Sequence, residues 1–438
     1  MKANRPNRAS ICIAAVIGVA LASIAPAAQA AAGDLDPSFA GGGVQTLPFP
    51  NSYAYADEVA RQTDGKIVVF GTAHSSVGIV SDFALVRLLA DGSLDTTFGD
   101  EGRVTTDFDG RYDEGLALAL QRDGKIVAAG SSTGSVSVAR YLPDGSLDRS
   151  FGGDGRLLLD LGVEARARGL AIQGNGKIVV AIDDGWTFSV ARLRRAGALD
   201  KTFGDGGIAS EDFSPDSSDW VRAVALDGAG GILLGGLVFP SRGATHDDWG
   251  LARFDRHGNL DTAFGDGGLT TTDFASSGPD VLEDLVIQPD GMIVAAGQSS
   301  TEPGDFDQLS DVTVARYDAQ GVLDPEFGDD GWVRTDLGSV FDTGRSVALG
   351  PNGTIVVASD VYEDANAQAA AVRYTAGGEL DTTFGGGDAV AVVDTPSSSD
   401  QAFGVIVQPN GRIVIAGSHA TLDQNGTSFE FLVARFLG

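Results

Sequence analysis

The chain has 438 residues, and its 60 Asp and Glu outnumber its 30 Lys and Arg, which gives a formal net charge of −30 at pH 7. Such a surface repels nucleic acids and anionic membranes, attracts cations or basic partners, and also keeps the protein soluble. The chain contains a single cysteine, Cys12, so disulfides are excluded as the support of the fold.

The first thirty residues have the pattern of a secretory signal peptide. A basic segment (1–8) precedes an apolar segment (11–26) and the small-residue sequence AQA (28–30). The apolar segment is short for a bilayer span, and no later segment matches it, so we expect no membrane span. We predict cleavage after Ala30 and export to the periplasm or the medium. Removal of the three basic residues would change the formal charge from −30 to −33.

The rest of the chain is built from repeats. The pattern Leu-Asp-x-x-Phe occurs seven times, at intervals of 52 to 63 residues, and no linker separates the copies. Two further patterns also occur seven times: a turn followed by Gly-x-Ile-Val/Leu, and a short apolar segment that ends in Arg. Residues 31–438 are therefore expected to form a single domain of seven repeats.

Each repeat contains four short segments in which apolar residues alternate, which we name strands a, b, c and d in chain order. In one repeat they are GLALALQ (115–121), KIVAAG (125–130), SVSVARYL (135–142) and SLDRSFGGDGRLLLDL (146–161). No segment has convincing helical periodicity. Four antiparallel strands repeated seven times predict an all-β fold, a seven-bladed β-propeller with four-stranded blades.

The phase of the repeats predicts how the ring closes. After residue 30 the chain begins with a d segment (35–49), and it ends just after a c strand at Gly438. We expect the N-terminal d segment to pair with this last c strand and so leave no unpaired seam.

Every repeat but the last has an Arg followed eight residues later by an Asp, as in Arg140 and Asp148. A Pro-Asp-Gly hairpin loop between them would place the two residues opposite each other on neighbouring strands. Asp36 and Arg435 lack such a partner within their own segments, and closure of the ring would place them opposite each other as an ion pair. Because an enzyme needs one active constellation and not seven, we interpret these residues as structural ion pairs. At blade edges each pair would contribute about 0–1 kcal/mol.

The segments LDTTFG, QPDGMIVAAG and VARYLPDGSLD resemble the delta-60 repeat family of secreted bacterial proteins and, more distantly, NHL-type propeller repeats. The resemblance covers residues 35–438. It implies the propeller fold, and it implies no reaction.

The b–c and d–a connections vary in length and share one face of the ring, which is our candidate binding surface and is called the b–c/d–a face below. Five repeats carry an Asp where strand a begins, and the other two carry Ala54 and Ala165. If strand a is innermost, as in NHL-type propellers, these acids would ring one mouth of the central channel. Ca²⁺ would suit them, and otherwise no cofactor is expected. The alternative is that each Asp caps its own loop. The five acids are Asp113, Asp219, Asp280, Asp342 and Asp400.

Histidines and aromatic residues fall on the same face. His74, His246 and His419 follow b strands, and they would hold Zn²⁺ only if the fold gathers them, because their spacing fits no metal motif. The alternative is that they are solvated loop residues. Four aromatic residues there would stack on a sugar or anchor a protein, unless they pack between blades: Trp186, Trp220, Trp249 and Tyr112.

No nucleophile elbow, phosphate loop or His-Glu-x-x-His motif is present in the sequence. We therefore predict an exported, monomeric, non-enzymatic scaffold that binds a protein or carbohydrate ligand on the b–c/d–a face. The alternatives are a metal-assisted lyase or hydrolase at an acidic channel mouth, with His74 or His419, and a purely structural envelope component.

Overall fold

The computed structural model describes residues 30–50, 52–75, 80–109, 112–215, 218–239, 246–274, 278–300, 310–339, 341–363, 366–393, 395, 398–423 and 426–438. The chain divides into two units, Met1–Ala30 and Ala31–Gly438. The expected signal peptide lies outside the described residues except for Ala30, so only the second unit is considered from here on.

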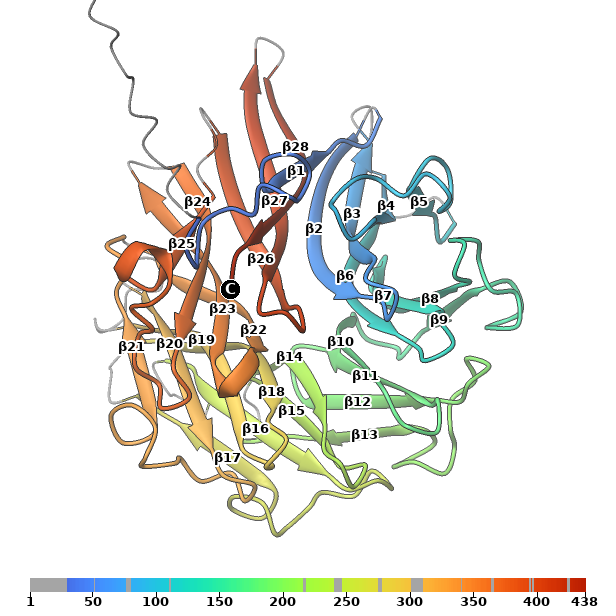
Figure 1. Cartoon of the computed structure of the whole chain (residues 1–438). Helices are drawn as coiled ribbons and strands as arrows, with labels where there is room; N and C mark the ends of the chain where they lie inside the picture. The colour runs from blue at the N-terminus through green and yellow to red at the C-terminus, as the bar shows by residue number, and fades with distance from the viewer. Residues whose placement is uncertain are drawn as a thin grey trace, which may run out of the picture. The chain divides into compact units, whose positions relative to one another are not determined.

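The strands of this unit lie in seven antiparallel sheets of four strands, which we number as blades 1 to 7 (Figure 1). Blade 1 contains β2 (Ser52–Arg61), β3 (Ile67–Ser75), β4 (Ser81–Leu88) and β5 (Arg103–Thr106). Blade 2 contains β6 (Asp113–Leu120), β7 (Ile126–Ser132), β8 (Ser135–Tyr141) and β9 (Arg156–Leu159). Blade 3 contains β10 (Arg166–Ile172), β11 (Ile178–Asp183), β12 (Phe188–Leu193) and β13 (Ile208–Glu211). Blade 4 contains β14 (Asp219–Leu226), β15 (Ile232–Val238), β16 (Asp248–Phe254) and β17 (Leu269–Thr272).

The remaining blades follow the same order. Blade 5 contains β18 (Asp280–Ile287), β19 (Ile293–Ser300), β20 (Ser310–Tyr317) and β21 (Trp332–Thr335). Blade 6 contains β22 (Thr343–Leu349), β23 (Ile355–Glu363), β24 (Asn366–Tyr374) and β25 (Val390–Val392). Blade 7 contains β26 (Ser398–Val407), β27 (Ile413–Asp423), β28 (Gly426–Phe436) and, as its fourth strand, β1 (Val44–Leu47).

The predicted fold class, a seven-bladed β-propeller of four-stranded antiparallel blades, is confirmed. The only helical segments among the described residues are two 3₁₀ turns, Pro351–Gly353 and Gly385–Gly387, so this part of the chain offers no helix that could cross a membrane. The first strand of each blade contacts the first strands of both neighbouring blades, so these strands surround the centre of the ring. They are β2, β6, β10, β14, β18, β22 and β26.

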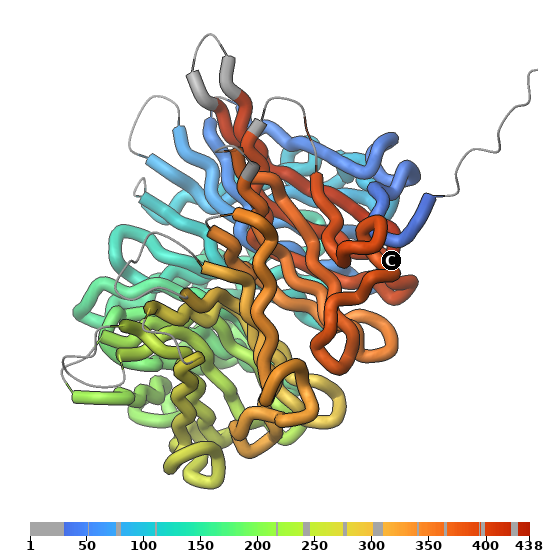
Figure 2. The backbone as a smooth tube through the Cα atoms, turned by 90° about the vertical axis from the view of Figure 1, so that its left-hand side faces the viewer, coloured from blue at the N-terminus to red at the C-terminus, as the bar shows by residue number. Residues whose placement is uncertain are grey.

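Blade 7 joins the two ends of the described chain. β1 pairs with β28 in a register that runs from Val44 opposite Ala434 to Leu47 opposite Phe431. Beyond this strand the backbone N–H of Asp36 donates to the carbonyl oxygen of Arg435 at 2.8 Å. The first described strands and the last lie side by side in both views (Figures 1 and 2).

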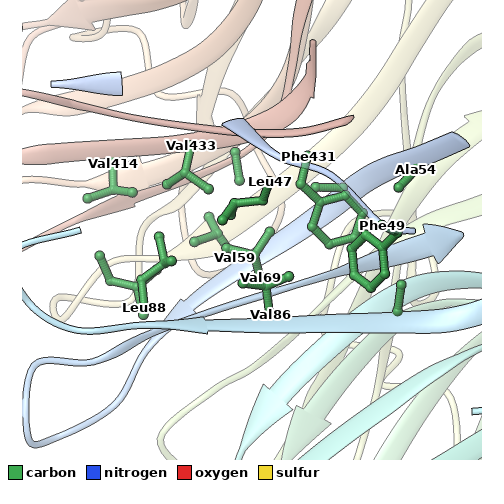
Figure 3. Packing of buried hydrophobic residues seen from close by; sticks show 14 of the residues in the cluster. Leu47, Phe49, Ala54, Val59, Val69, Val86, Leu88, Val414, Phe431 and Val433 are labelled. Atoms are coloured by element: carbon green, nitrogen blue, oxygen red, sulfur yellow. The ribbon is translucent and has the colours of Figure 1, made fainter. Parts of the chain in front are cut away.

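Hydrophobic side chains that alternate along the strands pack between neighbouring blades. Between blades 7 and 1, Phe49 lies edge-on to Phe431 with the ring centroids 5.0 Å apart. Figure 3 shows the surrounding cluster, in which Leu47 and Val433 approach Val59 and its neighbours from the other blade. Full burial of each such side chain favours folding by about 1.5–3 kcal/mol. The core is therefore a series of interfaces between blades.

The Arg–Asp pairs are present in all seven blades. The Arg Nε donates to the Asp Oδ2 at 2.7–2.9 Å, and the pair of Asp36 and Arg435 has this geometry at 2.8 Å. Each guanidinium also lies over the Phe of its Leu-Asp-x-x-Phe segment, 4.4–4.8 Å from the ring centroid. In six blades it donates to a backbone carbonyl in the c–d turn of the following blade.

The expected place of these pairs at exposed blade edges is corrected for blades 1, 2, 3 and 7, where both partners are buried, whereas the pairs of blades 4, 5 and 6 are partly exposed. Arg140 and Asp148 are 4% and 5% exposed, because the Phe ring and the turn of the next blade cover them. Removal of one partner from a buried pair leaves an uncompensated charge and costs about 3–5 kcal/mol, well above the value for an exposed pair. In six blades the pair also joins its blade to the next one.

Candidate functional site in the central channel and at its mouth

The five acids at the start of strand a do not stand as exposed carboxylates around the channel mouth. All five are at most 2% exposed. Four of them accept a backbone N–H from their own d–a connection, for example Asp113 from Phe108 at 2.7 Å. The fifth, Asp400, accepts from the Thr395 hydroxyl at 2.5 Å and contacts His419 Nδ1 at 2.6 Å. These contacts agree with the interpretation that each Asp caps its own loop, because a short carboxylate satisfies backbone donors that the connection leaves unpaired.

The histidines do not gather into a metal site in the described part of the chain. His74 lies on β3, His246 contacts Asp248 at 3.4 Å, and His419 lies opposite Asp400 on neighbouring strands. None of them belongs to a described group of three side chains close enough together to hold one ion. The described residues therefore contain no group in which these imidazoles could hold Zn²⁺ together, as the lack of a metal-binding spacing in the sequence had indicated.

The tryptophans differ in exposure. Trp249 follows the alternative that it packs between blades: it is 1% exposed, and its ring centroid is 4.8 Å from that of Phe274. It is the second residue of β16, and its position in the alternation directs it to the interface with blade 5. Trp220 is half-buried beside Phe239, whereas Trp186 is 60% exposed.

Each of the seven inner strands contains a β-bulge at the same position. In β10, for example, Ala167 and Gly169 oppose the consecutive residues Ile182 and Ala181, so Arg168 is the extra residue. A bulge interrupts the pairing locally and redirects the side chain of the extra residue. The seven bulge residues line a common cavity of about 340 Å³ together with their neighbours. They are Asp57, Leu116, Arg168, Arg222, Glu283, Arg345 and Phe403.

Three of the bulge residues are arginines with incomplete hydrogen bonding. The Nε of Arg168 is 3.6 Å from Asp183, that of Arg222 is 3.8 Å from Glu283, and that of Arg345 is 3.6 Å from Asp360. These separations are too long for hydrogen bonds. All three Nε atoms are buried and have no hydrogen-bond partner. A planar guanidinium with spare donors suits a carboxylate, sulfate or phosphate group.

Burial raises the pKa values of the carboxyl groups in the cavity. Burial raises the pKa of Asp57 to about 8, and the nearby charge of Glu114 adds to the effect. Burial likewise raises the pKa of Glu58 to about 8, with a further contribution from Asp284. At neutral pH both groups are therefore mostly protonated and can donate hydrogen bonds. Asp284 accepts from the Val347 N–H at 2.8 Å and from the Ser346 hydroxyl at 3.0 Å, and burial raises its pKa to about 6.

A cluster of aromatic side chains crosses three blades on the b–c/d–a face, and we call it the aromatic rim. The ring centroid of Tyr55 is 4.7 Å from that of Phe429 and 5.7 Å from that of His74. The ring centroids of His74 and Tyr112 are 5.5 Å apart. Tyr53 completes the rim at 6.5 Å from Phe429. Tyr53 and Tyr112 are 38% and 49% exposed, so a ligand can reach their rings.

Glu114 is charged and influences both the aromatic rim and the cavity. It follows Tyr112 closely in the sequence and forms an ion pair with Arg166 at 3.3 Å. Burial is the main cause that raises the pKa of Asp57 in the cavity and of Tyr112 in the rim, and the charge of Glu114 raises both further. Burial lowers the pKa of His74, and the charge of Glu114 opposes this shift.

Two larger hollows, of about 670 and 590 Å³, lie between the a–b and c–d turns of blades 2, 3 and 4. Their lining includes Arg140, Arg192 and Lys177, which are already bound to Asp148 or Asp200. These hollows belong to the repeated frame, and their charged groups have partners within the protein.

The bulge residues were missed in the sequence although a signal was present. Each stands eight residues before the turn glycine of its repeat, as Arg168 does before Gly176. Five of the seven are charged, within strands that are otherwise mostly apolar. A charged residue that recurs at the same position of a mostly apolar strand indicates that this position faces a cavity or an opposite charge.

The comparison with known families agrees with a β-propeller built from repeats. Residues 62–98, 121–151, 288–327 and 350–384 are similar to a domain of unknown function, the DUF5122 beta-propeller. Among proteins of curated function, none matches the sequence.

Several solved structures resemble the fold of this chain at low sequence identity. A catalytically inactive virginiamycin B lyase from Staphylococcus aureus, with quinupristin, has a TM-score of 0.50 and 11% identity over 89% of this chain and 98% of its own. The polysaccharide lyase Uly1 has a TM-score of 0.50 and 11% identity over 87% of this chain and 89% of its own. A protein from Lactobacillus plantarum has a TM-score of 0.44 and 15% identity over 84% and 99% of the two chains. At such identities the likeness concerns the fold alone.

Proposed function

We propose that residues 31–438 form a non-catalytic binding protein for an acidic saccharide, which lies on the aromatic rim and directs its negative group into the central channel. The observation that carries the proposal is the set of three arginines, Arg168, Arg222 and Arg345, whose buried Nε atoms make no hydrogen bonds around one cavity and have carboxylates only at 3.6–3.8 Å. Buried donors without hydrogen bonds are costly, and an anionic ligand would satisfy them.

Two further features support a saccharide. Half-exposed aromatic rings such as Tyr53 and Tyr112 offer faces on which sugar rings stack. Asp57 and Glu58, protonated at neutral pH, supply hydrogen bonds to hydroxyl groups without repelling an anion.

The test is calorimetric titration of the 31–438 protein with trigalacturonate and, in parallel, with neutral maltotriose. We expect binding of the acidic trimer only. Arg222→Ala should weaken it about tenfold or more, because a hydrogen bond to a charged group is lost. Arg149→Ala, at an exposed position outside the channel, is the matched control and should bind like the wild type. Equal affinity for both sugars, or no loss in Arg222→Ala, would reject the proposal.

A lyase or hydrolase is the second candidate, favoured by the neighbouring acids Asp57 and Glu58 with pKa values of about 8. A carboxyl group that stays protonated at neutral pH can act as a general acid. Prolonged incubation with polygalacturonate separates the two functions. A binding protein leaves the polymer length unchanged, whereas an enzyme shortens it and loses this activity in Glu58→Gln.

We also infer that Met1–Ala30 directs export and is removed, and that the protein therefore works outside the cytoplasm. We further infer that it works there as a monomer. The order of basic, apolar and small residues supports this inference. Expression of the full chain in a bacterial host should yield a periplasmic or extracellular protein whose first residue is Ala31. An intact N-terminus in the cytoplasm would contradict it.

A further inference from the structure

Three groups of three aspartates, which we call the acid trios, occupy equivalent places in the propeller. In each trio one carboxylate oxygen per residue lies within 4.8 Å of the other two. The trios are Asp82, Asp107 and Asp113; Asp248, Asp273 and Asp280; and Asp311, Asp336 and Asp342.

Each trio joins two neighbouring blades. In the first, Asp82 lies on β4 of blade 1, Asp107 lies in the connection after β5, and Asp113 begins β6 of blade 2. The second trio has the same arrangement between blades 4 and 5, and the third between blades 5 and 6. The middle member of each trio is exposed, so an ion could enter from solvent.

The first trio contains buried oxygens without partners. Asp113 is 0% exposed, and its Oδ2 accepts from the Phe108 N–H, which holds the carboxylate in place. Its Oδ1 is buried without a hydrogen bond, and so is the Oδ1 of Asp82 from the other blade. Burial raises the pKa of Asp82, and the charges of Asp107 and Asp113 raise it further. An unpaired buried carboxylate is costly unless a proton or a cation compensates it.

The second trio shows the same feature. Asp248 is 5% exposed, and its Oδ1 makes no hydrogen bond, with His246 Nδ1 3.4 Å away. Burial raises the pKa of Asp248, and the charge of Asp273 adds to this effect. The unsatisfied oxygens therefore recur at a second junction with the same geometry.

We propose that the first and second acid trios each bind one Ca²⁺ ion, which links two blades beneath the b–c/d–a face. In the third trio both carboxylate oxygens of Asp342 already accept hydrogen bonds, from the Leu337 N–H and the Ser339 hydroxyl, so the proposal does not include it. Ca²⁺ prefers carboxylate oxygens at about 2.4 Å, so two ligands on opposite sides of the ion stand about 4.8 Å apart. Backbone carbonyls and water would supply the remaining ligands. These sites are separate from the channel arginines and do not depend on the proposed saccharide.

The chain contains its own control at the junction of blades 2 and 3. The positions equivalent to the first trio are Ser135, Asp160 and Ala165, so two of the three carboxylates are absent. This junction should bind no Ca²⁺, and its remaining acid can be changed without effect on the metal content.

The experiment is calorimetric titration of the chelator-treated 31–438 protein with CaCl₂ at concentrations up to about 1 mM, the range of extracellular calcium modules. We expect two ions per chain, and one in Asp113→Asn. Asp82→Asn, which changes a half-buried residue, serves if Asp113→Asn fails to fold. Asp160→Asn should keep two ions, and joint replacement of Asp82 and Asp248 by Asn should leave none.

Thermal unfolding gives a second readout. Ca²⁺ should raise the Tm of the wild type by several degrees, because it binds the folded state alone. The Asp82→Asn/Asp248→Asn variant should show no such rise, and Mg²⁺ should have a much smaller effect on the wild type. Absence of bound Ca²⁺, an unchanged stoichiometry in both single trio variants, or an equal effect of Mg²⁺ would overturn the proposal.

Discussion

The Arg–Asp pairs and the bulge residues each occupy seven equivalent positions, one in every blade. The residue types are uniform in the first set and varied in the second. The pair is the same in every blade, as in Arg140 and Asp148, and its Nε–Oδ2 distance is always 2.7–2.9 Å. The bulge residue changes from blade to blade, and its arginines keep Nε–carboxylate distances of 3.6–3.8 Å. In a repeat protein, uniform positions build the frame, whereas varied positions with unsatisfied groups indicate where a ligand acts.

The largest expected effect tests the frame at the place where the ring joins. Asp36→Ala should lower the free energy of unfolding by about 3–5 kcal/mol, since it leaves Arg435 buried without its partner. Asp148→Ala should cost less, because the hairpin between Leu142 and Ser146 still holds its strand. Urea unfolding of the two variants measures the difference. Equal losses of unfolding free energy would show that the pair in blade 7 stabilises the protein no more than the pair in blade 2.

The second prediction contrasts the frame with the channel. Arg140→Ala removes a satisfied guanidinium and should destabilise the protein by about 3–5 kcal/mol. Arg168→Ala removes a guanidinium whose Nε makes no hydrogen bond and stands 3.6 Å from Asp183, so it should lower the free energy of unfolding by less than Arg140→Ala does. Titration with trigalacturonate should show the opposite order, with binding retained in any folded Arg140→Ala and weakened in Arg168→Ala. A large loss of stability in Arg168→Ala would assign that residue to the frame.

The third prediction concerns pH. Asp57 and Glu58 have pKa values of about 8 in the folded protein and about 4 in the unfolded chain, so the folded state binds more protons between these values. Their contribution to stability is complete below about pH 4, falls as the pH rises to about 8, and is constant above it. The Tm of the wild type should therefore fall by several degrees relative to the Asp57→Asn/Glu58→Gln variant between pH 5 and 8. Parallel Tm profiles would show that the two acids titrate normally.

The smallest expected effect concerns the aromatic rim. Tyr112→Ala should weaken trigalacturonate binding by about 1 kcal/mol, or about fivefold, without changing the Tm, because an exposed ring contributes through stacking alone. Trp186→Ala is the control, since this exposed side chain belongs to blade 3 and lies outside the rim. A loss in Trp186→Ala and none in Tyr112→Ala would move the binding surface to blade 3.

The fold was predictable because local patterns agreed with the repeat. Alternating apolar residues, turn glycines and the eight-residue separation of Arg140 and Asp148 all act within one hairpin. The burial of the pairs was not predictable, because the side chains and turns that cover them come partly from the next blade, about 55 residues away in the case of Arg140 and the Arg195 carbonyl.

The site was predicted only in part for similar reasons. His74 and Tyr112 were expected on the b–c/d–a face, but their contact spans two blades. A bulge adds one residue to a strand, so counting in twos assigns the residues beyond Arg168 to the wrong side. The acid trios combine three separate chain positions, and the sequence showed only one member of each, such as Asp113, as a candidate.

The pairing of β1 with β28 also determines when the protein can finish folding. The ribosome makes β1 before every other described strand, and β28 comes after all of them, so residues 44–47 have no partner strand until the other six blades have been made. Six blades can assemble from consecutive strands as the chain emerges. The seventh is delayed until β28 has been made, and a product terminated before β28 would keep an unpaired strand edge that favours aggregation.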